Sequence, residues 1–124
     1  MHRLTDTERI ALVAENTDNM VVITDTNRKI VWVNQAYTIM TGYTLEDVAG
    51  QAAGFLQFNK TDQNTVDEIR EKLDKHLPVE KELLNRAKDG REYWVKLNIS
   101  PVYREDRFVG FISVERDITE EKTC

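Results

Sequence analysis

Residues 79–103, VEKELLNRAKDGREYWVKLNISPVY, carry the clearest fold signal in the sequence. Two strand-like runs flank Asp89-Gly90, and an Asp-Gly pair in that position is the strongest short signal for a β-hairpin. The chain turns again at residues 104–106, which are charged. We therefore expect three consecutive antiparallel strands, at about 79–88, 91–103 and 108–116.

The first half of the sequence predicts another hairpin and several helices. β-branched runs at 20–25 and 29–34 are joined by a short polar turn, which indicates two antiparallel strands. Apolar side chains recur at helical spacing in the clearest helix, at about 62–76. Its expected buried stripe is Val66, Ile69, Leu73 and Leu77. Further helices are expected at 5–16, where Thr5 and Glu8 have capping-box spacing, and at 35–40 and 45–48.

This order of elements predicts an α+β fold. Strand pairs separated by helices indicate a five-stranded antiparallel sheet with helices packed on one face and a flanking N-terminal helix. With 124 residues, the chain fits one domain. We divide it into a flanking helix at 1–18, a core at 19–117 and a C-terminal linker at 118–124.

Composition and motifs exclude several classes of protein. The net charge of −5 argues against a nucleic-acid partner, since phosphate contacts depend on Lys and Arg. Cys124 is the sole cysteine, so no internal disulfide or cysteine metal site is expected. No apolar run is long enough to cross a membrane in this segment, and a cytoplasmic domain is expected. No enzyme motif is present, and we expect no catalysis and no metal. His76 is assigned to the last turn of helix 62–76, where a cation offsets the helix dipole, rather than to haem ligation.

Strand alternation assigns side chains to the two faces of the sheet. Phe111, Ser113 and Glu115 share one face of the last strand, although spacing alone favours an exposed strand end for Glu115. Leu84 and Trp94 are expected on the opposite, outer face of the sheet. An apolar pair there predicts a cover, either the N-terminal helix or a second subunit, and hence a homodimer.

Several segments together resemble the PAS superfamily, over about residues 8–122. The hairpin turn and the ending Asp117-Ile118-Thr119 after the last strand carry much of this resemblance. The other matching segments are VITD at 22–25, IVWVNQAY at 30–37, TGY at 41–43 and LNRAKDG at 84–90.

Within that superfamily the chain is most similar to flavin-binding members, especially light-oxygen-voltage (LOV) domains. GQAAGFLQ at 50–57 is similar to the LOV motif that contains the photoreactive cysteine, and Ala53 stands at the cysteine position. The resemblance therefore implies no cysteinyl adduct. It also implies that Gln57 and Asn85 contact the flavin ring and that Arg70 contacts its phosphate.

The resemblance extends to positions where this chain departs from LOV domains. Gly54 replaces a second phosphate-binding arginine, Val95 replaces an asparagine at the flavin edge, and Glu115 replaces the glutamine near flavin N5. The segments around Asn85 and Val95 also resemble FAD-binding PAS domains of redox sensors. Thr24, at the end of the first matching segment, completes the expected cofactor-binding set.

The sequence thus predicts a sensory input domain with FMN or FAD as cofactor. An apolar slot for a flat ring is expected from Ile23, Leu83, Leu97 and Phe111. The domain would bind the flavin non-covalently and relay light or redox state to a fused output domain, such as a histidine kinase or a diguanylate cyclase. Two alternatives stay open: a cofactor-free dimerisation or interaction module, and a PAS domain that binds a small metabolite.

Overall fold

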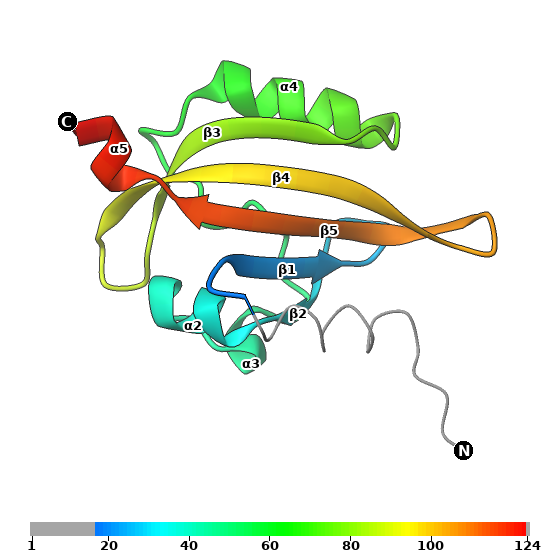
Figure 1. The fold of residues 1–124 in the computed structure, drawn as a ribbon, viewed down its shortest axis with the longest axis horizontal. Coiled ribbons are helices and arrows are strands. Elements are labelled where there is room, and N and C mark those ends of the chain that lie inside the picture. The colour runs from blue at the N-terminus through cyan, green and yellow to red at the C-terminus, as the bar shows by residue number, and fades with distance from the viewer. Residues whose placement is uncertain (1–16, 124) are drawn as a thin grey trace.

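The computed structural model describes residues 17–123 and contains five strands and four helices in that range (Figure 1). The helix expected at 5–16, and with it most of the flanking segment 1–18, lies outside the described residues. The strands are β1 (Met20–Thr24), β2 (Ile30–Val33), β3 (Val79–Arg86), β4 (Glu92–Arg104) and β5 (Arg107–Asp117). The helices are α2 (Gln35–Thr41), α3 (Leu45–Val48), α4 (Gln63–Asp74) and α5 (Thr119–Thr123).

The five strands form one antiparallel sheet in the order β2-β1-β5-β4-β3. This confirms the expected α+β class and the expected number of strands. The β3–β4 hairpin turns at Asp89-Gly90 as predicted, and Gly90 has a φ of 92°, which favours glycine. Sequence-distant β1 and β5 lie side by side at the centre, so the last strand forms the middle of the sheet.

Helices α2, α3 and α4 cover one face of this sheet, which we call the inner face. Figure 1 shows α4 alongside β3 at one edge and α2 and α3 beside β1 and β2 at the other. Asn34 joins these two layers. Its side-chain oxygen accepts hydrogen bonds from the backbone N–H groups of Val21 (2.9 Å) and Tyr37 (3.1 Å). The start of α2, and with it Tyr37, is therefore fixed against β1.

The long helix α4 is shorter than predicted. Asp62 caps it by accepting from the Thr65 N–H at 3.0 Å. Its buried stripe contains Val66, Ile69 and Leu73, but Leu77 lies beyond the helix and is 41% exposed. The placement of Leu77 in the stripe was therefore wrong, because the helix ends before it.

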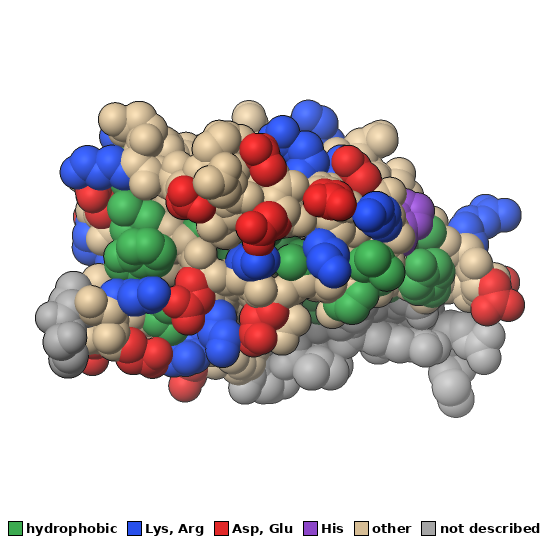
Figure 2. Space-filling model, turned by 90° about the horizontal axis from the view of Figure 1, so that it is seen from above, with side chains coloured by type: hydrophobic (Ala, Val, Ile, Leu, Met, Phe, Trp, Pro, Cys, Tyr) green, Lys and Arg blue, Asp and Glu red, His purple; other side chains and the backbone are tan. Residues whose placement is uncertain are grey.

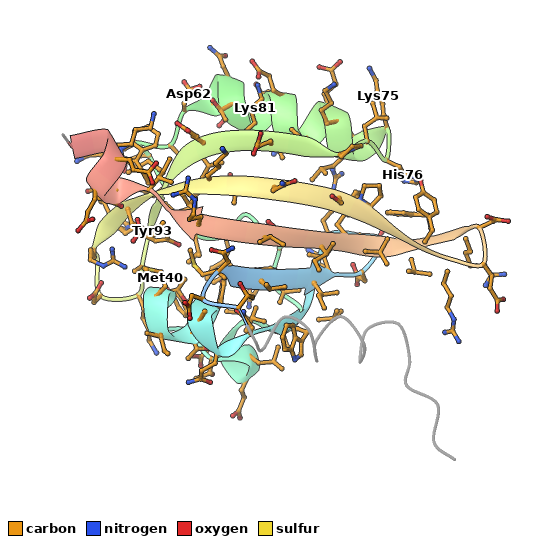
Figure 3. All side chains as sticks on the ribbon, in the orientation of Figure 1. Met40, Asp62, Lys75, His76, Lys81 and Tyr93 are labelled. Atoms are coloured by element: carbon orange, nitrogen blue, oxygen red, sulfur yellow. The ribbon has the colours of Figure 1, made fainter. Side chains whose placement is uncertain are left out.

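His76 also lies outside α4, with a φ of 54° (Figure 3). Its ring stacks on Phe108 of β5, with 3.7 Å between the ring centres. The predicted place in the last helical turn was therefore wrong, and contact with an aromatic side chain replaces the helix-dipole explanation.

The C-terminal helix α5 packs on the outer face of the sheet, around Trp94. The Trp94 N–H donates to the Thr119 hydroxyl at 2.9 Å, and the Ile118 N–H donates to the Trp94 carbonyl at 2.9 Å. The Lys122 ammonium lies 4.9 Å from the centre of the Trp94 ring. Trp94 is directly opposite Leu84 in the register, and both are half-buried. Helix α5 thus covers part of Trp94, whereas the sequence predicts the N-terminal helix or a second subunit as the cover.

The surface on the α4 side carries interspersed acidic and basic side chains (Figure 2). Lys81 pairs with Glu68, and Lys96 pairs with Glu80 at 3.3 Å. Within residues 17–123, no helix combines the length and apolar character needed to span a bilayer.

Candidate functional site

A cavity of about 420 Å³ lies between the inner face of the sheet, the helices and the segment at 52–57. This volume is in the range of small-molecule pockets, which is roughly 300–1,000 Å³. Inner-face side chains of four strands and one face of α4 form its walls. The strands contribute Val22, Thr24, Leu83, Asn85, Leu97, Ile99, Phe111, Ser113 and Glu115.

The apolar slot is largely the one expected from the sequence. Leu83, Leu97 and Phe111 line the cavity. Ile23 does not, because it points to the outer face, where it pairs with Ile112. Its assignment to the slot was wrong, and its neighbour Val22 lines the cavity instead.

Polar side chains converge at one end of the slot, which we call the polar end: Tyr37, Asn85, Tyr93, Ser113 and Glu115. All are buried in the structure. Among the described residues, the Tyr37 and Tyr93 hydroxyls, the Asn85 Oδ1 and the Ser113 Oγ have no hydrogen-bond partner of normal geometry, although Tyr93 lies close to Asn85 and Ser113 lies close to Glu115. An unpaired buried polar atom costs about 1–3 kcal/mol. Several such atoms around one cavity therefore indicate a ligand with a polar edge.

Glu115 is the buried carboxyl of the polar end, with 8% exposure. The expectation of an exposed strand end was wrong, because Glu115 lies mid-sheet, opposite Met20 on β1 and Leu97 on β4. Burial raises the pKa of Glu115 to about 7, and the nearby Ser113 hydroxyl opposes this shift. Burial, and then the Glu115 charge, also raise the pKa values of Tyr37 and Tyr93. This end therefore favours neutral groups that donate and accept hydrogen bonds.

The other end of the cavity carries charge, and we call it the charged mouth. It is lined by Asn27, Arg28 and Arg70, and Asp74 lies against Arg28. Arg70 lines the cavity from α4, as the resemblance implied, and is exposed. Arg28 also lines it, and its Nη2 donates to the Asp74 Oδ1 at 2.7 Å. Sequence reasoning missed Arg28, since a basic residue in a hairpin turn is usually just solvated. Its position in the turn that follows the cavity-lining strand β1 was the available signal.

The remaining expected site residues are placed as follows. Ala53 and Gln57 line the cavity from the segment between α3 and α4, and Thr24 lines it from the end of β1. Val95 is fully buried on the inner face but packs in the core rather than lining the cavity. Structure thus brings together Thr24, Ala53, Gln57, Arg70, Asn85 and Glu115, and leaves Val95 outside.

No metal site accompanies the cavity. Within the part of the chain that the structure describes, no group of three or more His, Cys, Asp or Glu side chains is arranged to hold a metal ion. The arrangement instead suits non-covalent binding of a flat ring with a polar edge and an anionic tail.

Comparison with protein families gives one match over most of the chain. A family model described as a PAS domain matches residues 18–120. Among curated proteins, the chain is 33% identical over 104 residues to a blue-light photoreceptor of Listeria monocytogenes, covering 82% of this chain and 41% of that protein. It is 34% identical over 117 residues to a blue-light-activated histidine kinase of Rhizobium johnstonii, and the match covers 91% of this chain and 34% of that protein. The chain thus spans less than half the length of these relatives.

Solved structures confirm the resemblance to LOV domains. The LOV domain of a blue-light-activated histidine kinase from Erythrobacter litoralis superposes with a TM-score of 0.78 and 27% identity, covering 84% of this chain and 99% of that one. An RNA-binding light-oxygen-voltage receptor superposes with a TM-score of 0.84, covering 98% of this chain and 38% of that one. Its 22% identity shows a shared fold alone.

Proposed function

Because this chain belongs to the PAS domain family, we propose that residues 19–117 form a sensory input domain that binds a flavin, FMN or FAD, without a covalent bond. The domain relays the light or redox state of that flavin to an output domain. The observation that carries the proposal is the polar end, where buried polar atoms without partners close an otherwise apolar slot.

The residues of the cavity fit a flavin. Its tricyclic ring is flat and apolar, and one edge alternates hydrogen-bond donors and acceptors. Leu83, Leu97 and Phe111 provide apolar walls, and the buried Asn85 amide offers both a donor and an unpaired acceptor. Gln57 adds a second amide, and Arg70 at the charged mouth would offer a cation to a phosphate tail.

A bound flavin would supply visible-light absorption and electron transfer. The residues of this chain hold it and report its state. Ala53 carries no thiol, so no adduct forms at that position. Glu115, a buried carboxyl that lines the cavity, would exchange a hydrogen bond or a proton with the ligand when the ligand changes state.

The route from Glu115 to the exit of the domain is short. Asp117 follows two residues later on β5, and its Oδ1 accepts from the Thr119 N–H (2.9 Å) and hydroxyl (2.6 Å). The same hydroxyl accepts from the Trp94 N–H. A change at Glu115 therefore biases the start of α5, which is a two-state element of the kind such switches use.

The output domain in this proposal is a histidine kinase or a diguanylate cyclase. Blue-light-activated histidine kinases among the relatives support the former. We place the domain in the cytoplasm and keep the expectation of no nucleic-acid partner and no catalytic step of its own.

The test is absorption of the purified chain after incubation with FMN or FAD. We expect a band at about 450 nm that co-purifies with the protein. The variant Ser113→Leu fills the polar end and should lose the band. Its matched control, Ser100→Leu, makes the same change on the outer face of β4 and should keep it. No binding by the unchanged chain would rule out the flavin proposal and leave a small metabolite as the ligand.

A second candidate is a contact module that works as a homodimer, without a cofactor. It is favoured by the half-buried pair Leu84 and Trp94 on the outer face, where the expected partners are the same face and N-terminal helix of a second copy. Leu84→Glu should halve the mass measured by light scattering, while Asn98→Glu, an exposed position on the same face, should not. An unchanged mass for Leu84→Glu would exclude this face as the dimer interface.

A further inference from the structure

We propose that Arg28, in the turn between β1 and β2, is a second anion-binding residue of the cavity and selects flavins with a phosphorylated tail over riboflavin. This inference rests on the proposed flavin function. It rests on the Arg28 and Arg70 side chains, which both line the cavity at the charged mouth, and on Asp74, the last residue of α4, which pairs with Arg28.

The turn that carries Arg28 is fixed by its backbone and by Asp25. The Asp25 carboxylate accepts from the N–H groups of Asn27 (2.9 Å) and Lys29 (3.0 Å). The Arg28 carbonyl accepts from the Ala53 N–H at 3.0 Å. The turn is thus joined directly to the segment that closes the cavity, so the Arg28 side chain starts at the rim.

The backbone of Arg28 has a φ of 64°, in the left-handed region. Glycine, asparagine and aspartate adopt this conformation more readily than arginine does. An arginine here contributes nothing to the turn that a glycine would not. The backbone of the turn therefore does not require an arginine, and the partly buried side chain both lines the cavity and pairs with Asp74.

The Arg28 side chain reaches across the mouth to α4. Its Nη2 is 2.7 Å from the Asp74 Oδ1, and Asp74 follows Arg70 by one helical turn, on the same side of the helix. Among the described residues Arg70 forms no ion pair or hydrogen bond. Arg28 is thus paired with a carboxylate while Arg70 is not, which leaves an excess positive charge at the mouth. A phosphate, with up to two negative charges and several acceptor oxygens, complements both groups.

The segment at 50–57 supplies no cation to this mouth. A side chain at Gly54 would place its Cβ 2.7 Å from the Gln57 Nε2, so it would displace that amide. A second cation beside Arg70 is available instead from the other side of the mouth, at Arg28.

Asp74 acts in this arrangement as the resting counter-ion of Arg28. An incoming phosphate has to replace it, so the carboxylate lowers the affinity for anionic tails. Removal of the carboxylate charge in Asp74→Asn should therefore strengthen FMN binding, in the opposite direction to removal of the Arg28 charge. Opposite effects from two contacting residues are difficult to obtain through general loss of structure.

The experiment is titration of the full chain with FMN, FAD and riboflavin, followed by flavin fluorescence. For Arg28→Gln we expect about tenfold weaker binding of FMN and FAD, because one charged hydrogen bond to the phosphate is lost. Binding of riboflavin should be unchanged. For Asp74→Asn we expect several-fold tighter FMN binding. The matched control is Arg107→Gln, an exposed arginine at the start of β5, which should leave all three affinities unchanged.

The outcomes separate this inference from the function on which it rests. If the unchanged chain binds none of the three flavins, the proposed function fails. If it binds them and Arg28→Gln leaves the ratio of FMN to riboflavin affinity unchanged, or weakens both equally, the role of Arg28 is wrong. Urea unfolding of both variants checks that the fold is intact.

Discussion

The polar end and the charged mouth of the cavity recognise a ligand by different physical means. At the polar end, Glu115 and Asn85 are buried, and the Asn85 Oδ1 has no hydrogen-bond partner among the described residues. At the mouth, Arg28 and Asp74 are partly exposed and already paired. Figure 3 shows Tyr93 of the polar end and Lys75, the neighbour of Asp74, toward opposite ends of the long axis of the molecule.

The difference has an energetic consequence. Buried polar groups destabilise the empty fold, and this cost is recovered when a ligand of matching shape binds, so the polar end provides selectivity for the ring. Partly exposed charges cost little when empty, and their attraction is weakened by salt. The mouth therefore distinguishes ligands by the charge of the tail.

The largest expected effect is that of Glu115→Gln on stability at high pH. The folded pKa of about 7 exceeds the ordinary value of 4.5, so the folded state binds this proton more tightly than the unfolded state does. Stability from this group is fully present below about pH 4.5 and is lost as pH rises to about 7. The loss amounts to about 3 kcal/mol. The glutamine variant should be more stable by up to that amount at pH 8 and nearly unchanged at pH 4.

Urea unfolding at several pH values measures this difference. Glu80→Gln, an exposed carboxyl on β3, is the control and should show no comparable dependence. If the free energy of unfolding of the unchanged chain and that of Glu115→Gln change in parallel from pH 4 to pH 8, the buried Glu115 carboxylate does not destabilise the fold as predicted.

This comparison also shows what the sequence could predict. The fold followed from local signals: Asp89-Gly90 located one hairpin, and the helical spacing of apolar residues located α4. Inner and outer faces were assigned correctly where a strand alternates, as in β3 and β4. The assignment of faces was wrong at Ile23, because every residue of β1 is buried and the pattern of this strand therefore does not distinguish its two faces.

The two residues that distinguish the ends of the cavity were the hardest to assign. The burial of Glu115 depends on a cover that includes Tyr37, which is far away in the sequence. The Arg28–Asp74 pair joins residues 46 positions apart. Neither contact has a local pattern. The resemblance placed Glu115 near the ligand although spacing did not, and it assigned Arg70 but not Arg28.

The next effect in size is that of Asn85→Leu on ligand binding. Removal of the amide takes away hydrogen bonds to the polar edge of the ring, so the affinity should fall about 10- to 100-fold. Because the tail is not involved, FMN and riboflavin should lose the same factor. Asn98→Leu, an exposed position on the outer face of β4, is the matched control. A loss of affinity for FMN but not for riboflavin would show that the polar end and the charged mouth do not act independently in ligand binding.

The smallest effect is that of salt, and it tests the charged mouth without any mutation. Between 0.05 and 0.5 M NaCl the range of electrostatic attraction falls from more than about 10 Å to less than about 5 Å. The mouth is partly exposed, so FMN affinity should fall by roughly threefold, while riboflavin affinity stays constant because its tail carries no charge. In Arg28→Gln the salt dependence for FMN should weaken, since one of two cations is gone. An equal response of both flavins to salt would mean that the charge of the tail is not what the mouth recognises.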